Sequence, residues 1–114
     1  MKTLKNILYK VSIESVIGST DRSIAALQYD SRRIEADAVF VAIKGGVFDG
    51  HTFISKAIEL GASVIVCQEL PEETVNTVTY IKVENSQKAL AVMASNFYGN
   101  PSENLKLIGI TGTN

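Results

Sequence analysis

The residues with the clearest chemical potential stand at the end of the chain, in Thr111-Gly112-Thr113-Asn114. They follow residues 105–110, which are typical of a strand. Glycine and threonine after a strand are typical of the start of a phosphate-binding loop, because small side chains let backbone N–H groups reach phosphate oxygens. A complete loop for a nucleoside triphosphate also needs a Gly-Lys-Thr or Gly-Lys-Ser triplet for the phosphates and Mg²⁺, and the sequence contains no such triplet. The segment therefore indicates either the first half of a phosphate loop or a glycine-rich tail.

A second group of polar and glycine residues follows two predicted strands. The triplet Asp30-Ser31-Arg32 comes after the first strand, and the segment 45–51 (GGVFDGH) comes after the next. Ligands of open α/β sheets bind in the crevice beyond the carboxyl ends of the strands. The Ser31 hydroxyl, the Arg32 guanidinium and the unobstructed backbone of the glycines suit a polar small molecule, such as one that carries phosphate. The alternative is that Asp30 and Ser31 form an Asx-type turn, that Arg32 is a solvated charge and that Asp49 caps a helix.

The single histidine and the single cysteine favour structural roles. His51 has no nucleophile or second metal ligand beside it, so we expect it to cap or to hydrogen-bond rather than to catalyse. Cys67 ends a strand pattern and is interpreted as a small buried hydrophobic residue. A lone cysteine excludes a disulfide within the chain and favours a reducing, cytoplasmic location.

The elements that must position these residues alternate along the chain. The hydrophobic pattern predicts strands at 24–29, 38–43, 63–67, 78–83 and 105–110. It predicts helices at 3–11, from Asp49 or Thr52 to Gly61, and from Asn85 or Ser86 to Gly99. The sequence therefore predicts an α/β fold: a small single domain with a mixed, partly parallel sheet flanked by helices.

Composition excludes several classes of protein. The chain has 114 residues, 46% of them hydrophobic, which is ordinary globular usage and excludes disorder. A net charge of −1 argues against nucleic acid as a partner, because tracking phosphates needs clustered cations. The longest apolar run, at 38–43, is far shorter than the roughly 20 residues that cross a bilayer. We therefore expect a soluble protein with neither nucleic acid nor membrane as partner.

Read in order, the motifs resemble the N-terminal domain of the Mur ligases. The motifs are DSRR at 30–33, VFVAIKG at 39–45, FDGHTFI at 48–54, FYGNPS at 97–102 and LIGITGTN at 107–114. The junction from FYGNPS to GITGTN is more similar to the MurE type, which adds the third peptide residue, and we favour that type. Phe48 is similar to the MurF type, which adds the terminal dipeptide, so that alternative stays open. A free-standing nucleotide-binding or regulatory module is the rival from a different class.

The resemblance implies an enzyme of peptidoglycan synthesis. The full-length protein would use ATP and Mg²⁺ to activate the D-glutamate carboxylate of UDP-N-acetylmuramoyl-L-alanyl-D-glutamate as an acyl phosphate. The amine of meso-diaminopimelate or L-lysine would then attack that acyl phosphate. Positioned donors and cations stabilise the charge that develops in such chemistry. The sequence does not discriminate between the two amino acids.

The resemblance also divides the chain. Residues 1–104 correspond to the domain that binds the UDP end of the substrate. Residues 105–114 correspond to the first strand and the start of the ATP phosphate loop of a central domain. The partners implied are the UDP-N-acetylmuramoyl-dipeptide and the missing central and C-terminal domains. The chain by itself is expected to be inactive.

The same resemblance implies roles for individual residues. Ser31 is expected to contact the uridine diphosphate. The residues expected to line the uracil and ribose pocket are Gly46, Val47 and Phe48. The residues expected to form the first half of the ATP loop are Thr111, Gly112, Thr113 and Asn114. No catalytic residue and no metal ligand is assigned.

Overall fold

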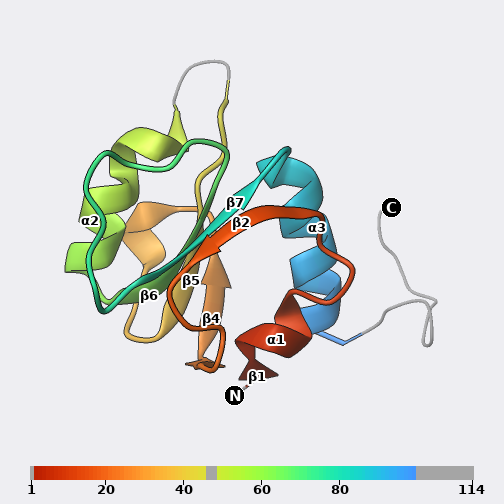
Figure 1. The fold of residues 1–114 in the computed structure, drawn as a ribbon. Coiled ribbons are helices and arrows are strands. Elements are labelled where there is room, and N and C mark those ends of the chain that lie inside the picture. The colour runs from red at the N-terminus through yellow and green to blue at the C-terminus, as the bar shows by residue number, and fades with distance from the viewer. Residues whose placement is uncertain (1, 46–48, 100–114) are drawn as a thin grey trace.

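A five-stranded sheet runs through the middle of the molecule (Figure 1). The computed structural model describes residues 2–45 and 49–99. The strands lie in the order β2-β7-β6-β5-β4. Their bounds are β2 (Ile13–Ile17), β4 (Ala26–Gln28), β5 (Ala38–Val41), β6 (Ala62–Cys67) and β7 (Thr79–Val83). Strands β4 to β7 pair in parallel and β2 runs antiparallel to β7, so the predicted mixed sheet of an α/β domain is confirmed.

Both faces of the sheet are covered, which explains why β5 and β6 are almost wholly apolar. Val64 and Val66 point into a core beneath α1 (Leu4–Ile7) and α3 (Ser86–Phe97). Ile65 and Cys67 alternate with them and point into a second core beneath α2 (Ile54–Glu59). Figure 1 shows α2 on one side of the sheet, and α1 together with α3 on the other. A short antiparallel pair, β1 (Lys2–Thr3) with β3 (Ser23–Ile24), lies beside α1.

The predicted helix boundaries rest on specific caps. Asn85, rather than Ser86, caps α3: its Oδ1 accepts a hydrogen bond from the Lys88 amide at 3.0 Å. Asp49, rather than Thr52, caps the 3₁₀ helix η2 (Gly50–Phe53), which leads into α2. Gly61 then ends α2 at φ +115°, a conformation that residues with a Cβ rarely adopt.

Three elements differ from the sequence-based expectation. Strand β2 was not predicted, because all five of its residues are exposed and show no alternation; it forms by pairing with β7, supported by an ion pair of 3.2 Å between Glu14 and Lys82. The first helix ends at Ile7 and not near residue 11. The predicted strand 24–29 is divided into β3 and β4. The predicted strand 105–110 lies outside the described residues.

We expect Asn85→Ala to lower the free energy of unfolding by about 1 kcal/mol, because the first turn of α3 loses its cap. Urea denaturation followed by circular dichroism measures this loss. Asn76→Ala, in the exposed turn before β7, is the matched control and should leave the midpoint unchanged. Equal midpoints for Asn85→Ala and the unaltered chain would contradict the capping role.

Candidate functional site

The carboxyl ends of the four parallel strands meet along one edge of the sheet. The Asp30-Ser31-Arg32 turn follows β4, and the loop that reaches η2 follows β5. Gln68 follows β6. The parallel pairing therefore brings together the two groups of residues that the sequence placed after separate strands, at the edge where open α/β sheets bind ligands.

The first group forms the 3₁₀ helix η1 (Ser31–Arg33), capped by Asp30. The Asp30 carboxylate accepts the Arg32 backbone N–H at 3.0 Å and pairs with the guanidinium through Nε at 3.1 Å and Nη2 at 2.9 Å. These hydrogen bonds lower the pKa of Asp30 from 3.8 to about 2. The Asx-type turn is thus confirmed, and the charge of Arg32 is already paired although its side chain is 88% exposed. Ser31, in contrast, is buried.

A pocket of about 440 Å³ opens between these two groups. Its lining residues are Tyr29, Asp30, Ser31, Arg32, Phe40, Ile43, Gly50 and Phe53. The walls are mainly apolar and aromatic, while the Ser31 turn supplies polar groups on one side. This combination is typical of pockets for small organic ligands with a flat ring and a polar end.

Sequence reasoning identified Ser31 as a pocket residue but missed the aromatic wall. Phe53 was interpreted as part of the apolar face of a helix, and Tyr29 as the end of a strand. In the structure Phe53 remains 38% exposed and Tyr29 65% exposed, and both line the pocket. An aromatic residue at the carboxyl end of a predicted parallel strand is the signal that could have found Tyr29, whereas no such signal marks Phe53 in η2.

The loop after β5 has a closed neck. The Gly50 amide donates to the Ile43 carbonyl at 2.7 Å, and Lys44 pairs with Asp49 as an isolated antiparallel bridge. A Cβ on Gly50 would lie 2.6 Å from the Ile43 backbone nitrogen, so a glycine is required at this close approach. The predicted pocket residues Gly46, Val47 and Phe48 belong to this loop but lie outside the described residues. So do Thr111, Gly112, Thr113 and Asn114.

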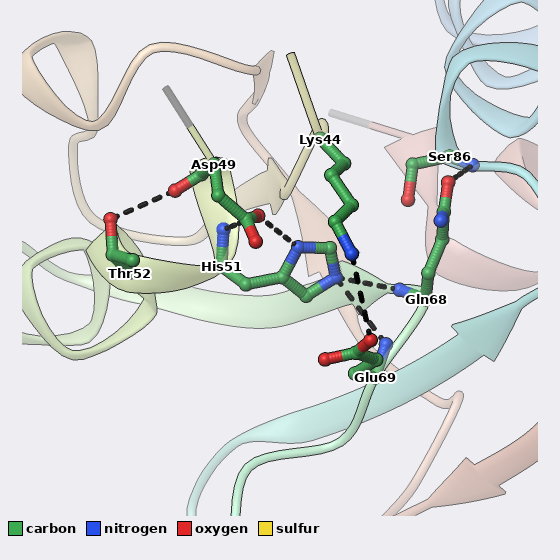
Figure 2. A network of polar contacts seen from close by, with 7 residues as sticks. All are labelled: Lys44, Asp49, His51, Thr52, Gln68, Glu69 and Ser86. Atoms are coloured by element: carbon green, nitrogen blue, oxygen red, sulfur yellow. Dashed lines mark hydrogen bonds and ion pairs between the residues drawn. The ribbon is translucent and has the colours of Figure 1, made fainter. Parts of the chain in front are cut away.

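His51 links this loop to the end of β6 (Figure 2). Its Nδ1 lies 2.7 Å from Asp49 Oδ1, and its Nε2 accepts the Gln68 backbone N–H at 2.9 Å and that of Glu69 at 3.3 Å. Backbone amides can only donate, so the ring proton resides on Nδ1 and Nε2 is unprotonated. The predicted structural role of His51 is confirmed. Hydrogen bonds from His51, the backbone one foremost, also hold the pKa of Asp49 below its ordinary value.

Cys67 and the possible metal ligands are also candidates for functional residues. Cys67 is fully buried as predicted, and burial raises the pKa of its thiol to about 11, which keeps it un-ionised and unreactive. Among residues 2–45 and 49–99, no group of three or more histidine, cysteine or carboxylate side chains is placed to hold a metal ion. None of the helices in the described part of the chain has the length and apolar character of a membrane span.

Comparison with known families identifies the class of protein. The sequence profile of the Mur ligase family, described as its catalytic domain, matches residues 23–98. The chain therefore belongs to the Mur ligase family, as the motif order predicted. The matched region contains the whole of the pocket and of the His51 network.

The chain is similar in sequence to curated proteins that share the name of one type of ligase. The chain is 48% identical over 112 residues to the UDP-N-acetylmuramoyl-L-alanyl-D-glutamate--2,6-diaminopimelate ligase of Cytophaga hutchinsonii. It is 50% identical over 113 residues to the ligase of that name in Clostridium tetani. These matches cover 97% of this chain and 23% of the relatives, so the chain spans about a quarter of their length. The relatives bear the name of the MurE type that the sequence favoured.

Solved structures agree on the fold. A MurF from Acinetobacter baumannii superposes with a TM-score of 0.68 at 21% identity, over 83% of this chain and 20% of that one. The MurF ligase from Thermotoga maritima, crystallised in complex with ADP, has a TM-score of 0.54 at 37% identity, over 66% of this chain and 17% of that one. The predicted Mur ligase fold class is confirmed.

The Asp30–Arg32 pair predicts an acid-dependent stability. The folded-state pKa of Asp30, about 2, is below the ordinary value of 3.8, so the pair contributes to folding at neutral pH. That contribution declines as the pH falls from 3.8 toward about 2. Arg32→Ala should move the Asp30 pKa partway back to 3.8, since the bond from the Arg32 amide remains. NMR titration of the carboxyl carbon measures the shift, and Arg33→Ala is the control that should change it little. An unchanged pKa in Arg32→Ala would refute this origin of the shift.

Proposed function

We propose that this chain is the UDP-substrate-binding part of a MurE-type ligase, which adds a diamino acid to UDP-N-acetylmuramoyl-L-alanyl-D-glutamate in peptidoglycan synthesis. The observation that carries the proposal is the pocket at the carboxyl edge between β4 and β5, where Ser31 faces the loop that leads to Gly50. The name shared by relatives that are 48% and 50% identical supports the choice of substrate.

The chemistry of the pocket fits a uridine. Phe53 and Tyr29 offer aromatic surface to a flat base, and Phe40 and Ile43 extend the apolar wall. Base–aromatic stacking contributes about 1–3 kcal/mol per base. The buried Ser31 hydroxyl can bond a ribose or diphosphate oxygen. We assign Gly46, Val47 and Phe48 to the lining of the uracil and ribose, because both ends of their loop are fixed at the pocket.

We assign residues 1–104 to the domain that binds the UDP end, and 105–114 to the first strand and phosphate loop of an ATP-binding domain. Thr111, Gly112, Thr113 and Asn114 would form the first half of that loop. In the proposed cytoplasmic reaction the D-glutamate carboxylate takes the γ-phosphoryl group of ATP, with Mg²⁺, and ADP leaves. The amine of the diamino acid then displaces phosphate to form the amide. The 114 residues contain no Gly-Lys-Thr or Gly-Lys-Ser triplet, so we expect no ATP turnover by this chain alone.

A MurF-type ligase is the second candidate. The Thermotoga maritima MurF is 37% identical over 66% of the chain, and Phe48 is a MurF-like residue. Both candidates bind a UDP-linked muramoyl peptide through the same pocket, so UDP binding does not separate them. The amino-acid specificity of the intact enzyme does: addition of a diamino acid supports MurE, and addition of a D-alanyl dipeptide supports MurF.

Titration of the isotope-labelled chain with UDP, followed by amide NMR, tests the binding proposal. We expect saturable shifts that cluster at Ser31, Ile43 and Gly50. Uridine should give the same pattern with weaker affinity, and inorganic phosphate should give little change. The absence of shifts at millimolar UDP would exclude the pocket as a nucleotide site.

We expect Ser31→Ala to weaken UDP binding by about five- to tenfold, which corresponds to the loss of one hydrogen bond of about 1–1.5 kcal/mol. The change is small and lies at the pocket wall, so the unfolding midpoint should move little. Isothermal titration calorimetry measures the affinity. Ser23→Ala, at the exposed position of β3, is the control and should bind as the unaltered chain does. Equal affinities of Ser31→Ala and Ser23→Ala would contradict a contact from Ser31.

Gly50→Ala tests the closed neck of the loop. The added Cβ would lie 2.6 Å from the Ile43 nitrogen, so the backbone must move. We expect a loss of about 1–3 kcal/mol in the free energy of unfolding, the usual cost of overpacking, and a larger loss of UDP affinity than in Ser31→Ala. Gly99→Ala is the matched control: its φ of +90° makes alanine unfavourable, but no atom of the described residues lies within 4 Å of the added carbon, and Gly99 does not line the pocket. Gly50→Ala would refute the role of the neck if it bound UDP as tightly as Gly99→Ala.

A further inference from the structure

We propose that His51 is a positioning residue for nucleotide binding: as the neutral Nδ1–H tautomer it fixes the loop after β5 to the end of β6, and its protonation or removal weakens UDP binding without any contact to the ligand. The inference rests on the proposed UDP site and adds to it a residue that does not line the pocket.

His51 lies between residues that line the pocket, so its hydrogen bonds help to position the pocket wall. The residue stands between two pocket residues, since Gly50 precedes it and Phe53 follows within the same 3₁₀ helix. Its side chain is only 11% exposed and lies between Asp49 and the backbone beyond β6 (Figure 2). The bonds to Gln68 and Glu69 therefore connect one wall of the pocket to a strand that is not part of the pocket.

Among the described residues, the other polar contacts that hold this loop are either internal to it or exposed to solvent. The hydrogen bond from the Gly50 amide to the Ile43 carbonyl closes the neck, but both residues belong to the segment that follows β5. The Lys44–Glu69 pair also crosses to β6, but at 3.8 Å between side chains that are 56% and 75% exposed it contributes little. His51 thus supplies the part-buried connection between the loop and its neighbouring strand.

The link requires a neutral ring. A proton on Nε2 would face the N–H donors of Gln68 and Glu69, and the two bonds would be lost. The charged groups around the ring are Asp49 on the Nδ1 side and Lys44 and Glu69 on the Nε2 side. A protonated ring retains its contact with Asp49 and loses its hydrogen bonds to the Gln68 and Glu69 amides. Protonation therefore removes the link between η2 and the backbone beyond β6.

Three variants separate positioning from general loss of stability. His51→Leu removes both bonds of the ring, and we expect UDP affinity to fall by about tenfold, the equivalent of about one lost hydrogen bond. His51→Gln keeps an acceptor that reaches the Gln68 amide, and should recover much of the affinity. Asn85→Ala removes a cap of similar type at α3, outside the loop, and should bind UDP as the unaltered chain does. Equal affinities of His51→Leu and Asn85→Ala would overturn the inference.

The pH profile distinguishes a positioning role from a merely structural one. On acidification from neutral pH, UDP affinity should fall more steeply in the unaltered chain than in His51→Gln, because the glutamine amide cannot take up the proton that removes the acceptor. The terminal phosphate of UDP titrates in both proteins, so the difference between the two profiles reports on His51. Parallel profiles would contradict the inference.

Ring ¹⁵N chemical shifts and hydrogen exchange test the link without a ligand. At neutral pH we expect Nδ1 protonated and Nε2 bare, with the Gln68 amide protected from exchange and losing protection in His51→Leu. An Nε2–H tautomer would overturn the inference even if UDP binds. Absence of UDP binding by the unaltered chain, with the tautomer and the protection as expected, would instead refute the proposed function and leave His51 as a purely structural link.

Discussion

The constraint on which the rest of the structure depends is the parallel pairing of β4 to β7, with helices on both faces. It gathers the carboxyl ends of the strands at one edge, where the backbone leaves the sheet and its N–H groups need new partners. Beyond β6, the Gln68 and Glu69 amides find theirs in the imidazole of His51. The His51 hydrogen bonds that satisfy these backbone groups also hold η2, which lines the proposed nucleotide pocket. Fold stability and the proposed binding site are therefore coupled at the same few atoms.

The pocket has two walls that differ in how they are held in place. The Ser31 turn is made rigid by Asp30, whose carboxylate is fully occupied by Arg32, so the polar wall is preorganised. The opposite wall contains Gly50 and Phe53 of η2. The Gly50 bond to Ile43 and the His51 bonds to the backbone beyond β6 hold η2 in place. The share of the relatives' length that the chain spans, 23%, agrees with a unit that recognises one end of a long substrate while the bond is formed elsewhere.

Much of this could be predicted from the sequence, for physical reasons that differ between elements. The runs at β5 and β6 are apolar because both faces are buried, and Asn85, Gly61 and Asp49 mark helix ends by local hydrogen bonding and backbone conformation. Strand β2 escaped prediction because its pairing partner, and not its own pattern, makes it a strand. The partners of His51 escaped because Gln68 lies 17 residues away and contributes only its backbone, which no residue type reveals. Ser31 followed from a motif, whereas Phe53 needed the geometry.

We propose above all that the pocket between β4 and β5 receives the uridine of a UDP-linked substrate. A crystal structure of the chain with UDP tests that claim. We predict the uracil between Phe53 and the Ser31 turn, with Ile43 and Gly50 beside the ribose and His51 still bonded to the Gln68 amide. Nucleotide bound instead in the separate hollow beside Lys10 and Lys88, with the Ser31 pocket empty, would contradict the account.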